Sequence, residues 1–309
     1  MNGPRMNGPR LEELALHIDH MACQALRDEV NLPLKPGLVC PQDPGSHADM
    51  TANTFLRSVH ALRGYFHDCF VLGYQGETLH PLQQRGLLAE RAMLAATEGV
   101  NTHKGAIFLL GLLAAAAGVQ WARQGDINPM QLGGVVQTEW GAAIAVAGVQ
   151  ASTAPHLACS HGLKVKASHG LPGAREQAAQ GFPVLFHITL PQLLWAHQQG
   201  AGPHQARLHA LYSTMARLPD TNLAHRGGLD GLNWAQAQAE YFLARGGVFA
   251  HAWAVQAQAM CQRFKARWLS PGGCADLLSA ALFVQRLGVV CHATHVQQHQ
   301  DHHAILGEP

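Results

Sequence analysis

The chain has 309 residues, enough to bury a sizeable core in one large domain or two small ones. Hydrophobic residues make up 48% and charged residues only 13%, and the net charge of +1 gives no global field that would favour nucleic acid as a partner. The seven cysteines are odd in number and include no CxxC pair, which argues against a secreted disulfide framework and against a structural zinc site.

The chain begins with a tandem polar duplicate, MNGPRMNGPR, which lacks the apolar core of a signal peptide. We expect residues 1–10 to be disordered. Apolar residues at helical spacing then predict a helix over Leu11–Val30, which ends before Pro33. A loop rich in proline and glycine is expected over Leu34–Met50, and a second helix over Thr51–Phe70.

The next two helices are predicted over Leu79–Thr97 and Ala106–Arg123. The longest apolar run, Gly105–Val119, has fifteen residues, whereas a membrane span needs about 20. We therefore expect a buried helix here, in a cytoplasmic protein with no membrane partner. Small residues over Val135–Ala151 predict a closely packed helix, and a polar loop is expected over Ser152–Gly173.

The C-terminal half is also predicted to be helical. No segment alternates convincingly with a period of two, and the nearest, Val184–Leu190, is short. We predict an all-α fold: a single compact multi-helix catalytic domain over residues 11–290, with polar loops that converge on a nucleotide cleft. The remaining helices are expected at Ala174–Gln180, Leu190–Gln199, His204–Leu218, Gly231–Arg245, His251–Leu269 and Ala275–Leu287.

A His-rich tail is expected over residues 291–309. Its histidines recur at spacings of three and four, which would put several imidazoles on one helical face. We favour an incidental polar tail over a metal site. The histidines are His292, His295, His299, His302 and His303.

The first candidate binding motif is Gly99-Val-Asn-Thr-His-Lys-Gly105, directly before the most apolar helix. Asn101 or Thr102 can cap that helix, and a helix N-terminus binds phosphate through its free N–H groups. Lys104 would add a full charge, and Gly105 would let the ligand come close. The alternative is a capped core helix with a solvated lysine. No GxxxxGK[ST] loop is present.

A second motif combines Lys35-Pro-Gly-Leu-Val39 with Gly45-Ser-His-Ala-Asp49. Lys35 offers a cation, while His47 and Asp49 offer a general base or a metal ligand. The alternative interpretation is a surface turn.

Four further motifs place carboxylates beside cations or glycines. Turned glycines that lead into a helix bind anions, and carboxylates can hold Mg²⁺ beside the cations that bind phosphates. The simpler interpretations are surface ion pairs and a first-turn aspartate that stabilises its helix. The motifs are Glu90-Arg91, Gly173-Ala-Arg-Glu176, Asp220-Thr-Asn222 with Arg226-Gly-Gly228, and Ser270-Pro-Gly-Gly273 followed by Asp276.

Taken in chain order over about Leu11–Leu287, these stretches resemble the triphosphoribosyl-dephospho-CoA synthase family, together with Glu29-Val-Asn-Leu32 before the second motif and Gly181-Phe-Pro183 after Glu176. The most specific stretch is Gly99-Val-Asn-Thr-His-Lys-Gly-Ala-Ile-Phe108. The departures from the family pattern are Cys40, where many relatives carry an aspartate, the polar segment Ser152–Gly170, and the His-rich tail.

The resemblance implies a transferase that forms 2'-(5''-triphosphoribosyl)-3'-dephospho-CoA and adenine from ATP and 3'-dephospho-CoA. The product is the prosthetic-group precursor for the acyl carrier protein of malonate decarboxylase or citrate lyase, and a downstream holo-acyl-carrier-protein transferase would use it. The Gly-Ser-His form of the second motif favours malonate decarboxylase. An oxocarbenium-like transition state calls for nearby carboxylates, and two polyanionic substrates call for cations and Mg²⁺. The alternatives are a non-catalytic nucleotide- or metal-binding regulatory protein and a helical scaffold.

Motifs and resemblance together predict the site residues. His47 or a carboxylate would accept the proton of the attacking hydroxyl, and His103 would protonate adenine or orient the phosphate loop. Catalytic roles are predicted for His47, Asp49, His103 and Glu176, and Mg²⁺ binding for Glu90, Asp220 and Asp276, with Asp276 and Glu90 preferred. Nucleotide binding is predicted for Lys35, Arg91, Asn101, Thr102, Lys104, Gly105, Arg175, Asn222, Arg226, Gly272 and Gly273.

Overall fold

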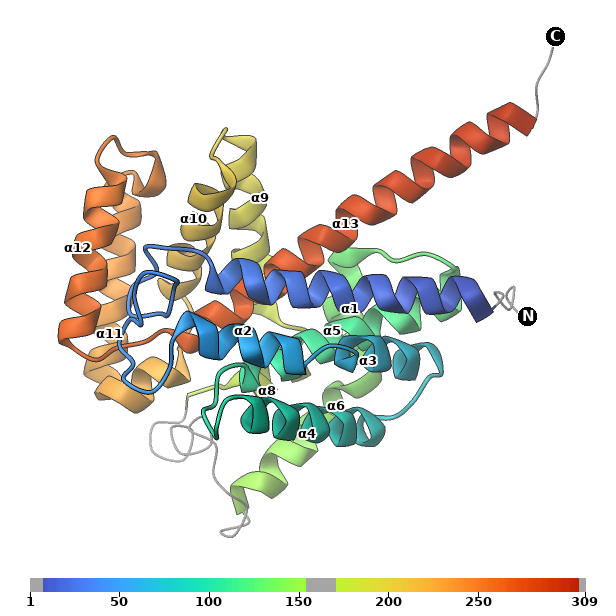
Figure 1. The fold of residues 1–309 in the computed structure, drawn as a ribbon, viewed down its shortest axis with the longest axis horizontal. Helices are drawn as coiled ribbons and strands as arrows, with labels where there is room; N and C mark the ends of the chain where they lie inside the picture. The colour runs from blue at the N-terminus through green and yellow to red at the C-terminus, as the bar shows by residue number, and fades with distance from the viewer. Residues whose placement is uncertain (1–7, 154–170, 306–309) are drawn as a thin grey trace.

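The computed structural model describes residues 8–153 and 171–305, and it confirms the predicted all-α architecture (Figure 1). Within these ranges no strand is present, and a single isolated bridge joins Cys40 to Asp43. The α-helices are α1 (Gly8–Val30), α2 (Ala52–Ala61), α3 (Tyr65–Tyr74), α4 (Leu79–Ala96), α5 (Lys104–Gln124), α6 (Leu132–Thr153), α8 (Ala174–Ala179), α9 (Leu190–Gln198), α10 (Pro203–Met215), α11 (Thr221–Ala244), α12 (Trp253–Ala266) and α13 (Gly272–Ile305). Short helical turns lie at η1 (Pro129–Gln131), η2 (Leu185–Thr189) and η3 (Gly247–Phe249).

Several predicted boundaries fall at the edges of the described residues. We expected residues 1–10 to be disordered. Residues 1–7 lie outside the described residues, and α1 begins at Gly8. Most of the loop expected over Ser152–Gly173, namely residues 154–170, also lies outside the described residues. Helix α13 continues without a break to Ile305, and the side chains of the predicted His-rich tail are not described. The domain boundaries at residues 10 and 290 therefore stay predictions.

Helix α5 forms the centre of the core, as its apolar run predicts. Fourteen of its residues are buried, and α3 packs along it more extensively than any other helix. Glycines allow the two backbones to touch. A β-carbon on Gly73 would come within 1.9 Å of the Ala115 carbonyl oxygen, and one on Gly118 within 2.0 Å of the Phe70 carbonyl oxygen. α5 is the one described helix long and apolar enough to cross a membrane, but 78% of its apolar window is buried inside the protein, as in a core helix.

The single helix predicted over Thr51–Phe70 is wrong, because the structure has two helices there, α2 and α3. Gly64 separates them with a φ of 86°, a left-handed conformation that glycine adopts without strain. The Asp19 carboxylate of α1 accepts hydrogen bonds from the N–H groups of Gly64 (3.0 Å) and Phe66 (3.1 Å) and so caps α3. Both helices pack on α1, so the apolar periodicity runs across the break.

Two other segments differ from the sequence-based expectation. Val184–Leu190, the nearest approach to a strand pattern, contains the π-helical turn η2 and leads into α9. The helix predicted to begin at Gly231 begins at Thr221 instead, and it accommodates a non-helical residue, Gly228 (φ 64°, ψ −167°). The pair Gly227-Gly228 predicts a loop from sequence alone. In the structure the chain only kinks at Gly228 and continues as α11.

Candidate active site

The two halves of the second motif fold against each other and against the segment before α13. The Ser46 N–H donates to the Gly37 carbonyl oxygen (3.0 Å). A β-carbon on Gly45 would lie 2.6 Å from that same oxygen, and one on Gly37 would lie 2.0 Å from the Leu269 carbonyl oxygen. Both glycines have positive φ values, of 62° and 69°. Only glycine fits at these positions, which explains why the motif has this composition.

Lys35 is committed to a buried ion pair. Its Nζ lies 2.6 Å from the Glu29 Oε1 and also donates to the Glu29 carbonyl oxygen (2.5 Å). The exposed fractions of the two side chains are 1% and 6%. The predicted nucleotide-binding cation is therefore already neutralised by a carboxylate that we did not predict as a site residue. Removing either partner would leave an unpaired buried charge.

His47 is held on both sides of its ring. Its Nε2 lies 2.9 Å from the Ser270 Oγ, and its Nδ1 lies 3.0 Å from the Arg226 Nη2. Because a guanidinium only donates, Nδ1 is the acceptor and the Nε2 N–H donates to Ser270. Burial and the Arg226 charge lower the pKa of His47 to about 4, while the exposed carboxylate of Asp49, 4.0 Å from Nδ1, has the opposite effect. His47 is thus a neutral imidazole with both nitrogens in use.

Asp220 connects the starts of two helices. Its Oδ1 accepts from the N–H groups of Asn222 (2.8 Å) and Leu223 (3.4 Å) at the start of α11. Its Oδ2 accepts from the Cys274 N–H (2.9 Å) at the start of α13. A β-carbon on Gly273 would lie 3.1 Å from that oxygen. The carboxylate is buried, and burial raises its pKa even though these hydrogen bonds act in the opposite direction.

Asp276 joins α13 to the start of α5. A β-carbon on Gly105 would lie only 1.9 Å from the Asp276 Oδ2, and the Ala106 N–H donates to the same carboxylate. Burial, together with the charges of Asp220 and Glu29, raises the pKa of Asp276 well above its usual value. Two neighbouring carboxylates thus disfavour the charged form of Asp276, and within the described residues Asp276 has no ion-pair partner.

His103 is the N-cap residue of α5 and faces the interior. Its Nδ1 lies 2.7 Å from the Ser58 Oγ, and its ring meets the Phe55 ring edge-on at 5.0 Å between centroids. Burial, assisted by the Lys35 charge, lowers the pKa of His103 to about 3. The His103 Nε2 and the Thr102 Oγ1 are buried atoms without a hydrogen-bond partner. A neutral His103 suits the predicted orienting role better than a role as the acid.

The remaining residues of the phosphate motif lie at the surface. The N-cap position of α5 is occupied by His103, whose side chain makes no cap hydrogen bond, rather than by the predicted Asn101 or Thr102. Asn101 lies just before it, and its Oδ1 accepts a hydrogen bond from the Lys104 N–H (3.3 Å). Lys104 also forms an ion pair with Glu90 of α4. Arg91, on the same helix, is exposed. Lys104 was predicted to bind nucleotide and Glu90 to bind Mg²⁺, and without ligands the two side chains pair with each other.

The Gly-Ala-Arg-Glu motif lies beside the start of α11. A β-carbon on Gly173 would be 3.9 Å from Thr221, and the Gly173 N–H donates to the Glu176 Oε2 (2.9 Å). Arg175 points towards α6, where it donates to the Ala147 carbonyl oxygen (3.5 Å). Glu176 therefore caps α8, a structural function that the predicted catalytic role did not include.

The starts of α5, α8, α11 and α13 thus meet through the predicted motifs. Asn222 and Gly272 complete this junction, because a β-carbon on Gly272 would lie 2.8 Å from the Asn222 side chain. We call it the helix-start junction: Gly105 and Ala106 of α5, Asp220 and Asn222 of α11, and Gly272, Gly273 and Asp276 of α13. Glu29, Ser58 and Ser270 are polar partners that were not predicted as site residues, although Ser270 belongs to a predicted motif.

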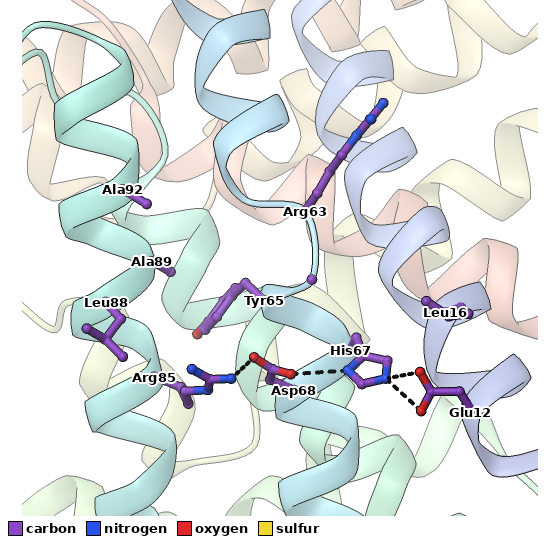
Figure 2. Close-up of a pocket in the computed structure, with 11 residues that line it drawn as sticks. Glu12, Leu16, Arg63, Tyr65, His67, Asp68, Arg85, Leu88, Ala89 and Ala92 are labelled. Carbon is purple, nitrogen blue, oxygen red and sulfur yellow. Dashed lines mark hydrogen bonds and ion pairs between the residues drawn. The ribbon is translucent and has the colours of Figure 1, made fainter. Parts of the chain in front are cut away.

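A separate hollow of about 380 Å³ lies between α1, α3 and α4, and no predicted site residue lines it (Figure 2). Asp68 pairs with Arg85 and with the His67 Nδ1 (3.1 Å), and the His67 Nε2 lies 3.2 Å from Glu12. Burial would lower the pKa of His67, but the hydrogen bonds to Asp68 and Glu12 outweigh it and raise that pKa. This charged network ties three helices together.

No group of three or more His, Cys, Asp or Glu side chains within residues 8–153 and 171–305 is arranged to enclose a metal ion. Mg²⁺ usually binds through one or two carboxylates and completes its shell with water and substrate phosphates. The Asp276 carboxylate, which has no cation beside it, fits that mode of binding. The predicted Mg²⁺ ligands stay predictions.

The CitG family model, ATP:dephospho-CoA triphosphoribosyl transferase, matches residues 15–293. Three similar proteins bear the name "Probable 2-(5''-triphosphoribosyl)-3'-dephosphocoenzyme-A synthase". They come from Acinetobacter calcoaceticus (38% identity; 90% of this chain and 93% of the relative), Vibrio cholerae serotype O1 strain M66-2 (36%; 91% and 91%) and Stutzerimonas stutzeri strain A1501 (40%; 86% and 90%). No solved structure matches the chain.

Proposed function

This chain belongs to the ATP:dephospho-CoA triphosphoribosyl transferase family, and from that membership we propose that the helix-start junction is where ATP and dephospho-CoA react. The protein is accordingly a transferase, and membership disfavours the regulatory and scaffold alternatives. The main support for placing the active site here is the contact of Asp276 with Gly105. It brings the most family-specific stretch against the start of α13.

The triphosphate of ATP would bind at the starts of α5 and α13. A helix start carries a partial positive charge that favours phosphate. The N–H groups of Lys104, Ala106 and Cys274 already donate to side chains, so phosphate would displace these partners or bind beside them. Gly105, Gly272 and Gly273 keep the backbone open to a ligand, and all three are partly exposed. Lys104 would exchange part of its contact with Glu90 for a phosphate oxygen. The triphosphate survives the reaction, so a loop for phosphoryl transfer is not required.

The bond that breaks joins adenine to the ribose of ATP, and the bond that forms joins that ribose carbon to a ribose hydroxyl of dephospho-CoA. Asp49 is the better candidate for accepting the hydroxyl proton, because it is exposed beside His47, whose nitrogens are both occupied. His47 would hold Ser270 and Arg226 in place. His103 would orient the start of α5, and the carboxylates would stabilise positive charge on the ribose.

Mg²⁺, when bound, would neutralise the triphosphate charge. We propose that Asp276 holds it, with Glu90 as the second carboxylate once Lys104 turns to a phosphate. Asp220 is less available, since both of its oxygens accept backbone N–H groups.

The product would supply the prosthetic group of an acyl carrier protein through a holo-acyl-carrier-protein transferase in the cytoplasm. The Gly45-Ser-His47 form of the second motif supports malonate decarboxylase as the client enzyme, rather than citrate lyase. Growth on malonate or on citrate, restored by this gene in strains that lack their own synthase, distinguishes the two clients.

The activity itself is tested by mixing the purified protein with ATP, dephospho-CoA and Mg²⁺. We expect adenine and triphosphoribosyl-dephospho-CoA in equal amounts, measured by chromatography and mass spectrometry. Release of ADP or AMP, or no reaction at all, would contradict the proposal.

A further inference from the structure

The segment that links α12 to α13 contains a tryptophan in a position suited to glycine. Trp268 has a φ of 55°, in the left-handed region. Its N–H donates to the Lys265 carbonyl oxygen (3.0 Å), and the Leu269 N–H donates to the Phe264 carbonyl oxygen (3.1 Å). This pairing ends helices at a left-handed residue, which is usually glycine because a side chain is strained there.

Burial does not compensate for that strain. The exposed fraction of Trp268 is 59%, whereas that of the next residue, Leu269, is 1%. Among the ring contacts of the described residues, none involves Trp268; the nearby Arg267 stacks on Trp234 instead. Neither the backbone nor the packing therefore accounts for a large aromatic side chain at this position, and strained positions of this kind concentrate at functional sites.

Trp268 lies next to the helix-start junction. Its carbonyl oxygen accepts from the Arg226 Nη1 (3.1 Å), and the same nitrogen donates to the Ser46 carbonyl oxygen (2.7 Å). Two residues further on, the Ser270 Oγ contacts His47. Gly272, at the start of α13, is four residues away along the chain.

We infer that Trp268 provides a stacking surface for the adenine base of a substrate. The inference rests on the proposed function, in which both substrates carry an adenine. An exposed indole beside a cationic, hydrogen-bonded loop offers the flat apolar face on which a purine stacks. The phosphates of the same nucleotide would extend from there towards the start of α13.

The test compares the affinities of Trp268→Gly and the wild type for three probes: ATP, dephospho-CoA and inorganic tripolyphosphate, each alone in calorimetry. Glycine relieves the left-handed strain, so the variant should fold. We expect about a tenfold loss of affinity for one of the adenine nucleotides, and an unchanged affinity for tripolyphosphate. The nucleotide that loses affinity identifies whose adenine stacks. Trp268→Phe should recover most of the affinity.

Tyr241→Ala is the matched control. Tyr241 is an exposed aromatic residue (54%) near the other end of α11, about 30 Å along the helix from Asp220, and its loss should change none of the three affinities. Unchanged affinities of Trp268→Gly for both nucleotides would overturn the inference. An equal loss of affinity for tripolyphosphate would also overturn it, since Trp268 would then act on phosphate binding and not on the adenine base. Failure of the proposed function is distinguishable, because it would appear as a wild-type protein that releases no adenine.

Discussion

The Asp276 carboxylate lies against the α-carbon of Gly105, so closely that a β-carbon there would fall 1.9 Å from its Oδ2. We therefore predict that Gly105→Ala displaces Asp276 and lowers the rate of adenine release by at least about tenfold, since an active site tolerates little misplacement. Gly134→Ala is the control, because Gly134 lies in α6 and a β-carbon on it would have no neighbouring atom within 4 Å. A Gly105→Ala enzyme with the normal rate would place the reaction elsewhere.

Asp276→Asn tests the proposed Mg²⁺ ligand. The amide keeps the shape but removes the charge, so we expect a much slower adenine release that partly recovers as Mg²⁺ is raised. Kinetics over a Mg²⁺ titration provide the measurement. Loss of rate with no recovery at any Mg²⁺ concentration would instead indicate that the Asp276 carboxyl transfers a proton.

Lys104→Ala should weaken ATP binding, because a charge-assisted contact at the start of α5 is lost. The expected loss is about 1.5–3 kcal/mol, or roughly ten- to a hundredfold in the dissociation constant measured by calorimetry. Arg123→Ala removes a cation paired with Glu139 at the other end of α5 and should leave ATP affinity unchanged. Equal affinities of Lys104→Ala and the wild type would exclude Lys104 from the site.

The free energy of unfolding should fall as the pH drops from about 6.5 towards 4. The folded-state pKa of His47 is lowered to about 4 from 6.5, so in this range the unfolded chain binds the proton more readily. The stabilisation is present above pH 6.5 and is lost as the pH falls. His47 contributes a slope of up to about 1.4 kcal/mol per pH unit, and His103, whose pKa is lowered to about 3, adds a slope of the same sign. Urea unfolding at several pH values should show a shallower slope for His47→Asn, whereas replacing the exposed His251 should leave the slope unchanged.

Gly73→Ala should destabilise the core. The added methyl group would meet the Ala115 carbonyl oxygen at 1.9 Å and force α3 away from α5. We expect a loss of about 1–3 kcal/mol in the free energy of unfolding, measured with urea. Gly86→Ala is the matched helical control, since its nearest neighbour would be 3.5 Å away, and it should be neutral or stabilising.

The sequence predicted the helices whose apolar face is continuous and local. α5 is the clearest case, because nearly every residue of its apolar run is buried. The break at Gly64 was not predictable in the same way, since the cap that ends one helix and starts the next comes from Asp19, on another helix. Long-range caps leave no periodic pattern in the sequence.

The candidate site was predicted as a set of motifs, but not as a set of contacts. Sequence motifs placed Asp276 and Gly105 among the predicted site residues, and the structure brings them together. The motifs did not reveal that Lys35 is neutralised by Glu29, although Glu29 lies only six residues before it. A charged residue has a different role when it is buried against a partner, and burial depends on helices that are distant in sequence.

Under the proposed function, the contacts of Asp220 and Asp276 also set the point during synthesis at which the site can form. Glu29 and α5 are synthesised before α13. The first turn of α13 supplies Asp276 and the Cys274 N–H, which donates a hydrogen bond to Asp220. A nascent chain lacking α13 would have the start of α5 without its carboxylate. Contacts between residues so far apart in sequence form late in folding. Under the proposed function, adenine release therefore requires that the first turn of α13 has been synthesised and has packed against the start of α5.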